Sequence, residues 1–377
     1  MHACSERPRL RDLGYRVGEL PTGPGNAITD VAGVLVGHVT LYRPEEGVCT
    51  GVTAVRPHPG NTFREKVAAA VHVINGFGKA TGLAQVAELG TLETPVILTN
   101  TLAVGSAAEG LIRWMLEQDP GIGGAAGTVN PVVMECNDGY LNDARRREVG
   151  PEHVSRALEE AGPLPPAEGA VGAGTGMVCY GFKGGIGTAS RLVTGEAGTF
   201  TVGVLVLANF GRRRDLTVLG VPVGTLLEER RRAPRTPPGE AEAGRPGEGG
   251  SVIVLVATDA PVDARQLGRM ARRGVVGLAR TGSFVGHGSG DFVLAFSTAT
   301  RYRHDAPDRV CWAPFLPDHG ATFAALMRAV VESTEEAVLN ALFRATTTRG
   351  RLGRTVEALP VQEVLDILGA AAEYYKK

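Results

Sequence analysis

Long apolar runs, separated by glycine and short polar clusters, dominate this chain of 377 residues. Residues 67–75, 95–101, 131–136, 200–207 and 251–257 are apolar almost throughout, which is typical of strands buried on both faces. Further strands are predicted at 31–41, 51–56, 177–182, 189–193 and 291–297. Apolar positions at helical spacing predict helices at 83–89, 106–117, 151–161, 262–278, 321–345 and 361–371. This mixture predicts an α/β protein in which helices pack outside buried sheets.

One segment interrupts the pattern. Residues 233–250 contain nine Gly or Pro in 18 positions and no Val, Ile, Leu, Met or aromatic residue, so they cannot bury enough apolar surface to offset their ordering entropy. Immediately after them, Ser251 is followed by five consecutive aliphatic residues. Two interpretations stay open at this point. The segment is a flexible linker before a strand, or the Gly250–Ser251 bond is a processing site.

Composition and charge argue against a nucleic-acid-binding protein and against a membrane protein. With 39 Lys and Arg against 40 Asp and Glu, the chain lacks the basic surface that a nucleic-acid binder needs. The apolar runs are far shorter than the ~20 residues of a membrane-spanning helix. The first residues contain no apolar signal-peptide core, which argues against secretion. The five cysteines are odd in number and widely spaced, which argues against a disulfide framework. We therefore expect a cytoplasmic protein without membrane or nucleic-acid partners.

Common catalytic and cofactor motifs are absent from the sequence. There is no HExxH, GxSxG or P-loop pattern, and the histidines have no metal-ligand spacing, so we expect no metal and no cofactor. Glycine-rich stretches at 76–82 and 172–176 are interpreted as tight turns rather than dinucleotide-binding loops. Cys136 and Cys179 lie in apolar strands and are interpreted as core residues rather than nucleophiles.

Polar residues at strand ends form a more coherent set. Ser251 begins one strand and Asn209 ends another, while Tyr140 lies in a polar cluster and Ser289 and Asp291 enter a third strand. A serine hydroxyl is a weak nucleophile without an adjacent base. If Ser251 became N-terminal, its own α-amine, with an ordinary pKa of about 7.7–8.0, could supply that base. Such a hydrolase would need no catalytic histidine.

Eight short motifs occur in one order along nearly the whole chain. They are RDLG at 11–14, NAITDV at 26–31, VGH at 36–38, LTNT at 98–101, NDGYLN at 137–142, FKGGIG at 182–187, GS at 250–251 and SGD at 289–291. With these motifs the chain resembles the DmpA-type L-aminopeptidase/D-esterase family, which includes β-peptidyl aminopeptidases. The resemblance implies a four-layer αββα sandwich, similar to N-terminal-nucleophile hydrolases but with its own strand connectivity.

The resemblance also implies a self-processing serine aminopeptidase. Cleavage before Ser251 would divide the single catalytic domain 1–377 into an α fragment 1–250 and a β fragment 251–377. Ser251 would be the nucleophile and Asn209 an oxyanion donor. Tyr140 would hydrogen-bond at the reaction centre, and Ser289 and Asp291 would orient the nucleophile and its amine.

The substrates implied are short peptides, amides or esters, with Glu135 pairing with the substrate's free amino terminus. Asp291 stands where β-peptide-cleaving members carry a glutamate, so the resemblance does not imply a preference for β-peptides. It does imply a homo-oligomer of αβ units. Two alternatives stay open: an acyltransferase that passes the acyl group from Ser251 to an amine, and an unprocessed, non-catalytic binding protein.

Overall fold

Two β-sheets form the centre of the protein in this computed structural model, which describes residues 7–231, 250–306 and 310–374. One sheet has four strands in the order β1 (Leu35–Arg43), β2 (Val48–Arg56), β5 (Val96–Asn100), β6 (Val132–Cys136). The other has six strands in the order β4 (Thr91–Leu92), β3 (Glu65–Gly76), β12 (Gly290–Arg303), β11 (Ser251–Thr258), β10 (Gly198–Asn209), β9 (Gly185–Gly195).

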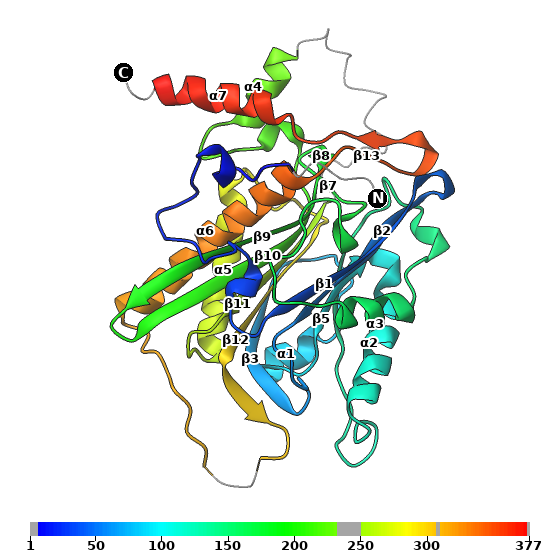
Figure 1. Ribbon diagram of the computed structural model, residues 1–377, viewed down its shortest axis with the longest axis vertical. Helices are drawn as coiled ribbons and strands as arrows, with labels where there is room; N and C mark the ends of the chain where they lie inside the picture. The colour runs from blue at the N-terminus through cyan, green and yellow to red at the C-terminus, as the bar shows by residue number, and fades with distance from the viewer. Residues whose placement is uncertain (1–6, 232–249, 307–309, 375–377) are drawn as a thin grey trace.

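Helices cover the outer face of each sheet (Figure 1). α2 (Val104–Gln118) and α3 (Pro151–Glu159) pack on the four-stranded sheet, and α5 (Ala264–Arg280) and α6 (Ala321–Arg344) pack on the six-stranded sheet. The remaining helices and short strands are α1 (Leu83–Leu89), α4 (Val223–Arg230), α7 (Val361–Tyr374), β7 (Val178–Cys179), β8 (Phe182–Lys183), β13 (Thr348–Arg349) and β14 (Thr355–Val356).

Strand β11 shows why its sequence is apolar at every position. Because side chains alternate between the two faces of a strand, Ile253 and Leu255 enter the core between the sheets, whereas Val254 and Val256 enter the core beneath α5 and α6. A strand with an apolar layer on each side has no face left for polar residues. The cores therefore confirm a four-layer arrangement of helices, sheet, sheet and helices.

The expected strand at 177–182 is wrong in one respect. The run is divided into β7 and β8, because Tyr180 and Gly181 both have positive φ (51° and 66°) and form a two-residue turn. The Tyr180 hydroxyl is hydrogen-bonded to Thr281 Oγ1 at 2.8 Å, which fixes this buried ring. The apolar character of the run reflects its burial rather than one continuous strand.

The chain before residue 250 and the chain after it are interleaved in one sheet. β11 and β12 lie at its centre, between β3 on one side and β10 on the other. β11 pairs antiparallel with β10 and parallel with β12, so the start of β11 lies beside the end of β10. Of the expected linker, only Gly250 is among the described residues, and 233–249 lie outside them.

Candidate active site

Ser251 and Asn209 form the last residue pair of the β10–β11 ladder. Both side chains are buried, with 5% and 7% of their surface exposed. In the same register, Ser251 lies opposite Gly290 of β12, which places the SGD sequence beside it. The sheet therefore brings together three polar segments that are far apart in the sequence.

The backbone of Asn137, just beyond the end of β6, joins Ser251 to Asn209. The Asn137 N–H donates to Ser251 Oγ at 3.3 Å, and Asn209 Nδ2 donates to the Asn137 carbonyl oxygen at 3.0 Å. Asn209 Oδ1 accepts from the Val178 N–H at 2.9 Å. Bonds at both ends of the Asn209 amide fix its orientation. Sequence reasoning included Asn137 only as part of a polar cluster, because a backbone donor has no side-chain signature.

Asp291 and Ser289 form a hydrogen-bonded group on the other neighbour of β11. The Val252 N–H donates to Asp291 Oδ1 at 3.0 Å, and the Ser289 hydroxyl donates to Asp291 Oδ2. Asn75 Nδ2 donates to Ser289 Oγ at 2.9 Å and lies 3.3 Å from Asp291 Oδ2. Burial raises the pKa of Asp291, while the hydrogen bonds from Ser289, Asn75 and Val252 oppose that rise. The sequence did not single out Asn75.

Glu135 is buried near the end of β6 and is already hydrogen-bonded. Its Oε1 accepts from the Lys79 N–H at 2.9 Å, and its Oε2 accepts from the Thr101 hydroxyl. Neither of these bonds involves Ser251. A substrate amine at Glu135 would share a carboxylate that is already held in position.

Tyr140 is half-buried in a small cluster with Cys49, Leu141, Val178 and Val356. The Arg354 guanidinium lies over its ring, 4.9 Å from the centroid, and Arg354 Nη1 donates to the Tyr140 carbonyl oxygen at 3.1 Å. Within the described part of the chain, the Tyr140 hydroxyl makes no hydrogen bond. The residue thus meets the site through Val178, which holds Asn209, rather than through its hydroxyl.

The thiols near the site are buried and neutral. Burial raises the pKa of Cys136 well above its ordinary value, and contact with the Ser251 hydroxyl opposes this only in part. Burial also raises the pKa of Cys179 to about 12. Since a thiol reacts as its thiolate, both groups are suited to packing rather than to nucleophilic attack.

Gly250 fits its position because it has no side chain. A Cβ atom there would lie 2.6 Å from the Asn209 carbonyl oxygen and 2.6 Å from Phe210 Cα. Both are backbone atoms that cannot move aside locally. The residue before Ser251 is therefore held close against the end of β10.

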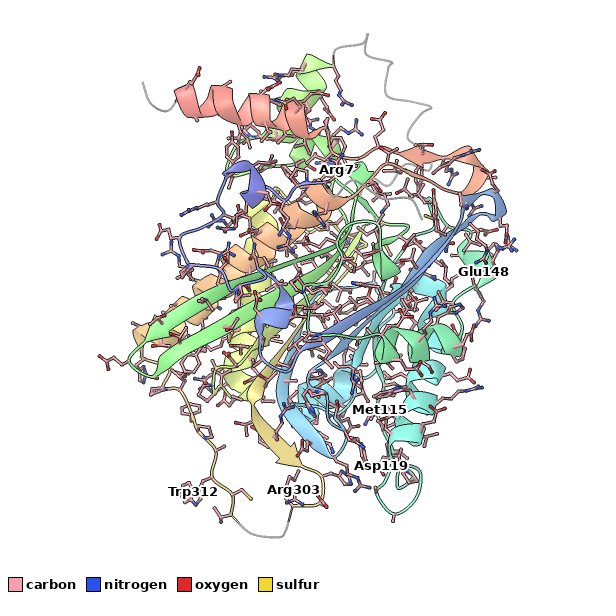
Figure 2. All side chains as sticks on the ribbon, viewed as in Figure 1. Arg7, Met115, Asp119, Glu148, Arg303 and Trp312 are labelled. Carbon is pink, nitrogen blue, oxygen red and sulfur yellow. The ribbon has the colours of Figure 1, made fainter. Side chains whose placement is uncertain are left out.

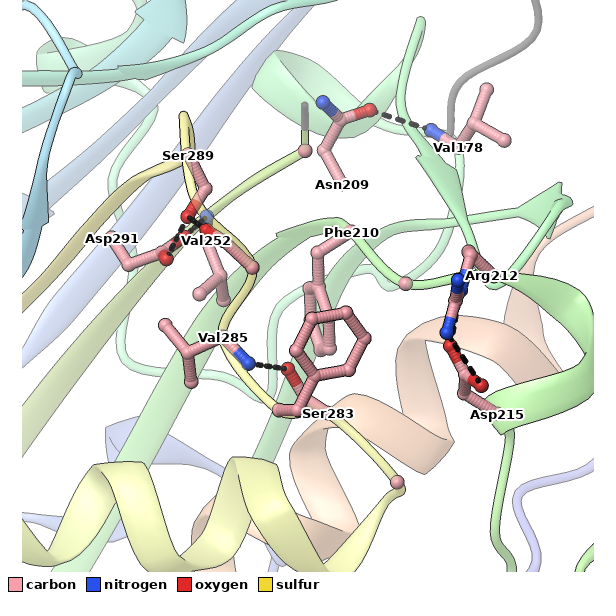
Figure 3. Close-up of a pocket in the computed structure, with 15 residues that line it drawn as sticks. Val178, Asn209, Phe210, Arg212, Asp215, Val252, Ser283, Val285, Ser289 and Asp291 are labelled. Atoms are coloured by element: carbon pink, nitrogen blue, oxygen red, sulfur yellow. Dashed lines mark hydrogen bonds and ion pairs between the residues drawn. The ribbon is translucent and has the colours of Figure 1, made fainter. Parts of the chain in front are cut away.

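A cleft opens beside Gly250 (Figure 3). Its apolar walls include Phe210, Phe284 and Val285, and Asp291 lies at one side. Arg212 and Asp215 form an ion pair at 2.8 Å on its opposite side. Within the described residues, no group of three or more His, Cys, Asp or Glu could hold a metal ion.

Comparison with known proteins identifies the family. The model of "Peptidase family S58" matches residues 26–356, a range that includes every residue of the site. The chain belongs to peptidase family S58.

Similar proteins agree with this membership. The chain is 41% identical to the beta-peptidyl aminopeptidase BapA of Sphingosinicella microcystinivorans, over 97% of this chain and 93% of that protein. The PH0078 protein of Pyrococcus horikoshii OT3 superposes with a TM-score of 0.88 at 48% identity, covering 97% of this chain and 99% of that one.

The l-aminopeptidase d-ala-esterase/amidase of Ochrobactrum anthropi has a TM-score of 0.86 at 37% identity, covering 97% of this chain and 99% of that one. That structure is described as a prototype of the serine aminopeptidases and a new variant of the Ntn hydrolase fold. These similarities confirm the resemblance, the fold class and the expectation of an aminopeptidase-type hydrolase. No helix in the described ranges has the length and apolar character required to cross a membrane.

Proposed function

We propose that this S58 peptidase cleaves its own Gly250–Ser251 bond and then uses Ser251 to release N-terminal residues from short peptides, amides or esters. The observation that carries the proposal is the position of Ser251. It is the first residue of a central strand, and its hydroxyl lies 3.3 Å from the Asn137 N–H with Asn209 opposite. A new N-terminus there would be held by the sheet on both sides.

Self-processing would proceed by acyl transfer within the chain. Ser251 Oγ attacks the Gly250 carbonyl carbon, the Gly250–Ser251 C–N bond breaks, and the nitrogen takes the hydroxyl proton as it becomes an amine. Water then hydrolyses the resulting ester, which leaves a carboxylate at Gly250 and restores the Ser251 hydroxyl. The absence of a side chain at Gly250 supports this step, because the carbonyl carbon is not shielded.

Substrate cleavage would repeat this chemistry with the free Ser251 amine as general base. The Asn209 amide, whose Oδ1 accepts from the Val178 N–H, would donate through Nδ2 to the developing oxyanion. Asp291 and Ser289 would fix the β11 backbone next to the nucleophile through the Val252 N–H. The Glu135 carboxylate would attract the protonated amine of the substrate, and the Tyr140 hydroxyl would join the site only when substrate is bound.

The cleft beside Gly250 indicates which residues would be released. A substrate's N-terminal residue would form its ester with Ser251 beside this cleft and, because it is not fixed in the chain as Gly250 is, could turn its side chain into the cleft. The walls formed by Phe210, Phe284 and Val285 favour apolar side chains. We therefore propose that peptides with an apolar N-terminal residue are the better substrates.

The chain organisation supports one catalytic domain made of two fragments. Because β11 and β12 lie between β3 and β10, fragments 1–250 and 251–377 would stay associated after cleavage through the shared sheet. The buried free thiols of Cys49, Cys136 and Cys179 are consistent with a reducing, cytoplasmic location.

Assembly into a homo-oligomer is supported by one exposed segment. Residues 310–317 between β12 and α6 extend away from the sandwich (Figure 2). Trp312 is 94% exposed there, Val310 79% and Phe315 55%. A cluster of exposed large apolar side chains is costly in water, and a second copy of the chain would cover it.

The proposal is tested by product analysis. The purified enzyme is incubated with amides of N-terminal Leu, Phe, Asp and Lys, with and without an added amine acceptor. Release of the free amino acid, fastest for Leu and Phe and absent in Ser251→Ala, supports the proposed peptidase. Transfer to the added amine in place of water would identify an acyltransferase, and no turnover of any amide would contradict the proposal.

A further inference from the structure

Lys183 is a fully buried cation whose hydrogen bonds to other described residues are all with backbone oxygens. Its Nζ donates to the carbonyl oxygens of Gly174 at 2.9 Å, Met177 at 2.8 Å and Gly184 at 2.9 Å. Three donors of an ammonium group thus meet three acceptors. A buried charge is costly unless it is fully hydrogen-bonded. We call the three carbonyl oxygens that meet this requirement the Lys183 cage.

The cage fixes the turn that orients Asn209. Gly174 and Met177 belong to the turn that precedes β7, and Val178, the next residue, donates its N–H to Asn209 Oδ1 at 2.9 Å. Lys183 therefore acts on the Asn209 amide through one intervening peptide group. Its own side chain makes no contact with Ser251.

Asp138 packs against the same turn at Gly176. It is fully buried and follows Asn137, the residue whose N–H donates to Ser251 Oγ. Gly176 lies so close that a Cβ atom there would be 2.7 Å from Asp138 Cβ. Asn142 Nδ2 donates to Asp138 Oδ1 at 3.0 Å, and the carboxylate interacts electrostatically with the Lys183 ammonium.

We propose that Lys183 and Asp138 are positioning residues that hold the turn 174–178, and with it the Asn209 amide, in place for the reaction at Ser251. This inference rests on the proposed function. It assigns a purpose to the lysine of the FKGGIG sequence and to the aspartate of NDGYLN that packing alone does not require. Neither residue touches the reacting atoms.

The two charges coexist only over a limited pH range. Burial lowers the pKa of Lys183 to about 8, while the negative charge of Asp138 opposes this. Burial raises the pKa of Asp138 to about 7, while Thr50 and Asn142 oppose this and Glu135 adds to it. The two thiols facing Lys183 stay neutral, since burial raises the pKa of each to about 12. Above pH 8, Lys183 Nζ would lose its extra proton and its positive charge.

The first experiment removes the ammonium. Lys183→Met keeps most of the length of the side chain and abolishes its charge. We expect kcat, counted per active site by covalent titration of Ser251, to fall about 10²-fold with little change in KM, because a misplaced donor weakens only the transition state. Lys66→Met is the matched control. Its Nζ bonds the Phe63 carbonyl oxygen and His304 near the far end of β3, so its kcat should stay at the wild-type value.

If Lys183→Met does not fold, a second variant tests the proposed positioning role. Asp138→Asn keeps the bond with Asn142 and removes the negative charge that raises the pKa of Lys183. The alkaline limb of kcat should therefore move to lower pH than in the wild type. A wild-type kcat in titrated Lys183→Met, or an unmoved alkaline limb in Asp138→Asn, would overturn the inference. Activity that persists in Ser251→Ala would instead overturn the proposed function itself.

Discussion

Asn209, the last residue of β10, lies directly opposite Ser251, the first residue of β11, and both bond the backbone of Asn137, Ser251 at its N–H and Asn209 at its carbonyl oxygen. The pair owes its position to the antiparallel register of two buried strands rather than to a loop. Groups on such rigid elements are held more accurately than groups on loops. The sheet thus explains how a serine without a histidine partner can lie in an ordered polar site.

Asn209→Ala tests the proposed oxyanion donor. We expect kcat to fall by about 10²–10³, the usual effect of losing one such donor, because nothing replaces Nδ2. Steady-state kinetics on a Leu or Phe amide measure it. Asn340→Ala is the control, since Asn340 is also buried and its Nδ2 bonds the carbonyl oxygen of Thr188 in β9. Equal losses of kcat in both variants would argue against a specific role for Asn209.

Gly250→Ala should slow self-processing without harming the processed enzyme. The new Cβ would approach the Asn209 carbonyl oxygen and Phe210 Cα to 2.6 Å, which displaces the scissile carbonyl from Ser251 Oγ. After cleavage residue 250 is a free chain end, so the strain is relieved. A time course of cleavage on denaturing gels measures the rate. Gly105→Ala, at a helical position with open space, should cleave at the wild-type rate.

Stability should fall in mild acid partly because of His38. Its side chain is half-buried, with Nδ1 bonded to Thr53 Oγ1 at 2.9 Å, and loss of solvation lowers its pKa to about 4 from 6.5. The unfolded chain therefore binds this proton more readily than the folded chain. The stabilisation is complete above pH 6.5 and is lost as the pH falls towards 4, at a cost of up to about 3 kcal/mol.

Urea unfolding of wild type and His38→Asn at pH 7 and pH 4.5 checks this contribution. The asparagine can keep the bond with Thr53 but does not titrate. The loss of unfolding free energy between the two pH values should be smaller in the variant. An equal loss in both proteins would show that His38 does not titrate as its burial suggests.

Trp312→Ser tests the proposed assembly. Wild-type protein should have a mass in light scattering that is a multiple of 39.4 kDa, and the variant should form smaller species. Leu164→Ser is the control, because Leu164 is also an exposed apolar side chain, at 77%, but lies on another segment. A monomeric wild type would contradict the assembly, and equal masses for wild type and Trp312→Ser would remove Trp312 from the interface.

The sequence predicted the buried strands and the layers well, because burial on two faces leaves a plain apolar signature at 251–257. It predicted Ser251, Asn209, Ser289 and Asp291 as strand-end polar residues, and the sheet brings them together. It could not predict Asn75, which meets Asp291 at a register shift between β3 and β12. A bulge of this kind depends on tertiary pairing, which no local pattern records.

The role of Lys183 was equally invisible in the sequence. A lysine at the end of an apolar run usually extends to solvent, whereas here its Nζ meets three backbone carbonyl oxygens that only the folded turn assembles. Gly181 is a turn residue, but the turn at Tyr180 and Gly181 was missed because apolar residues flank it on both sides and a tyrosine carries no turn signal.

The most direct measurement is the intact mass of the purified protein, with N-terminal sequencing of any fragment. The account predicts two polypeptides, the second beginning at Ser251, and a single uncleaved chain in Ser251→Ala. Ser106→Ala, a serine within α2, should be cleaved like the wild type. An unbroken wild-type chain that hydrolyses peptide amides at full rate would contradict the central claim, as would cleavage of Ser251→Ala at the same bond.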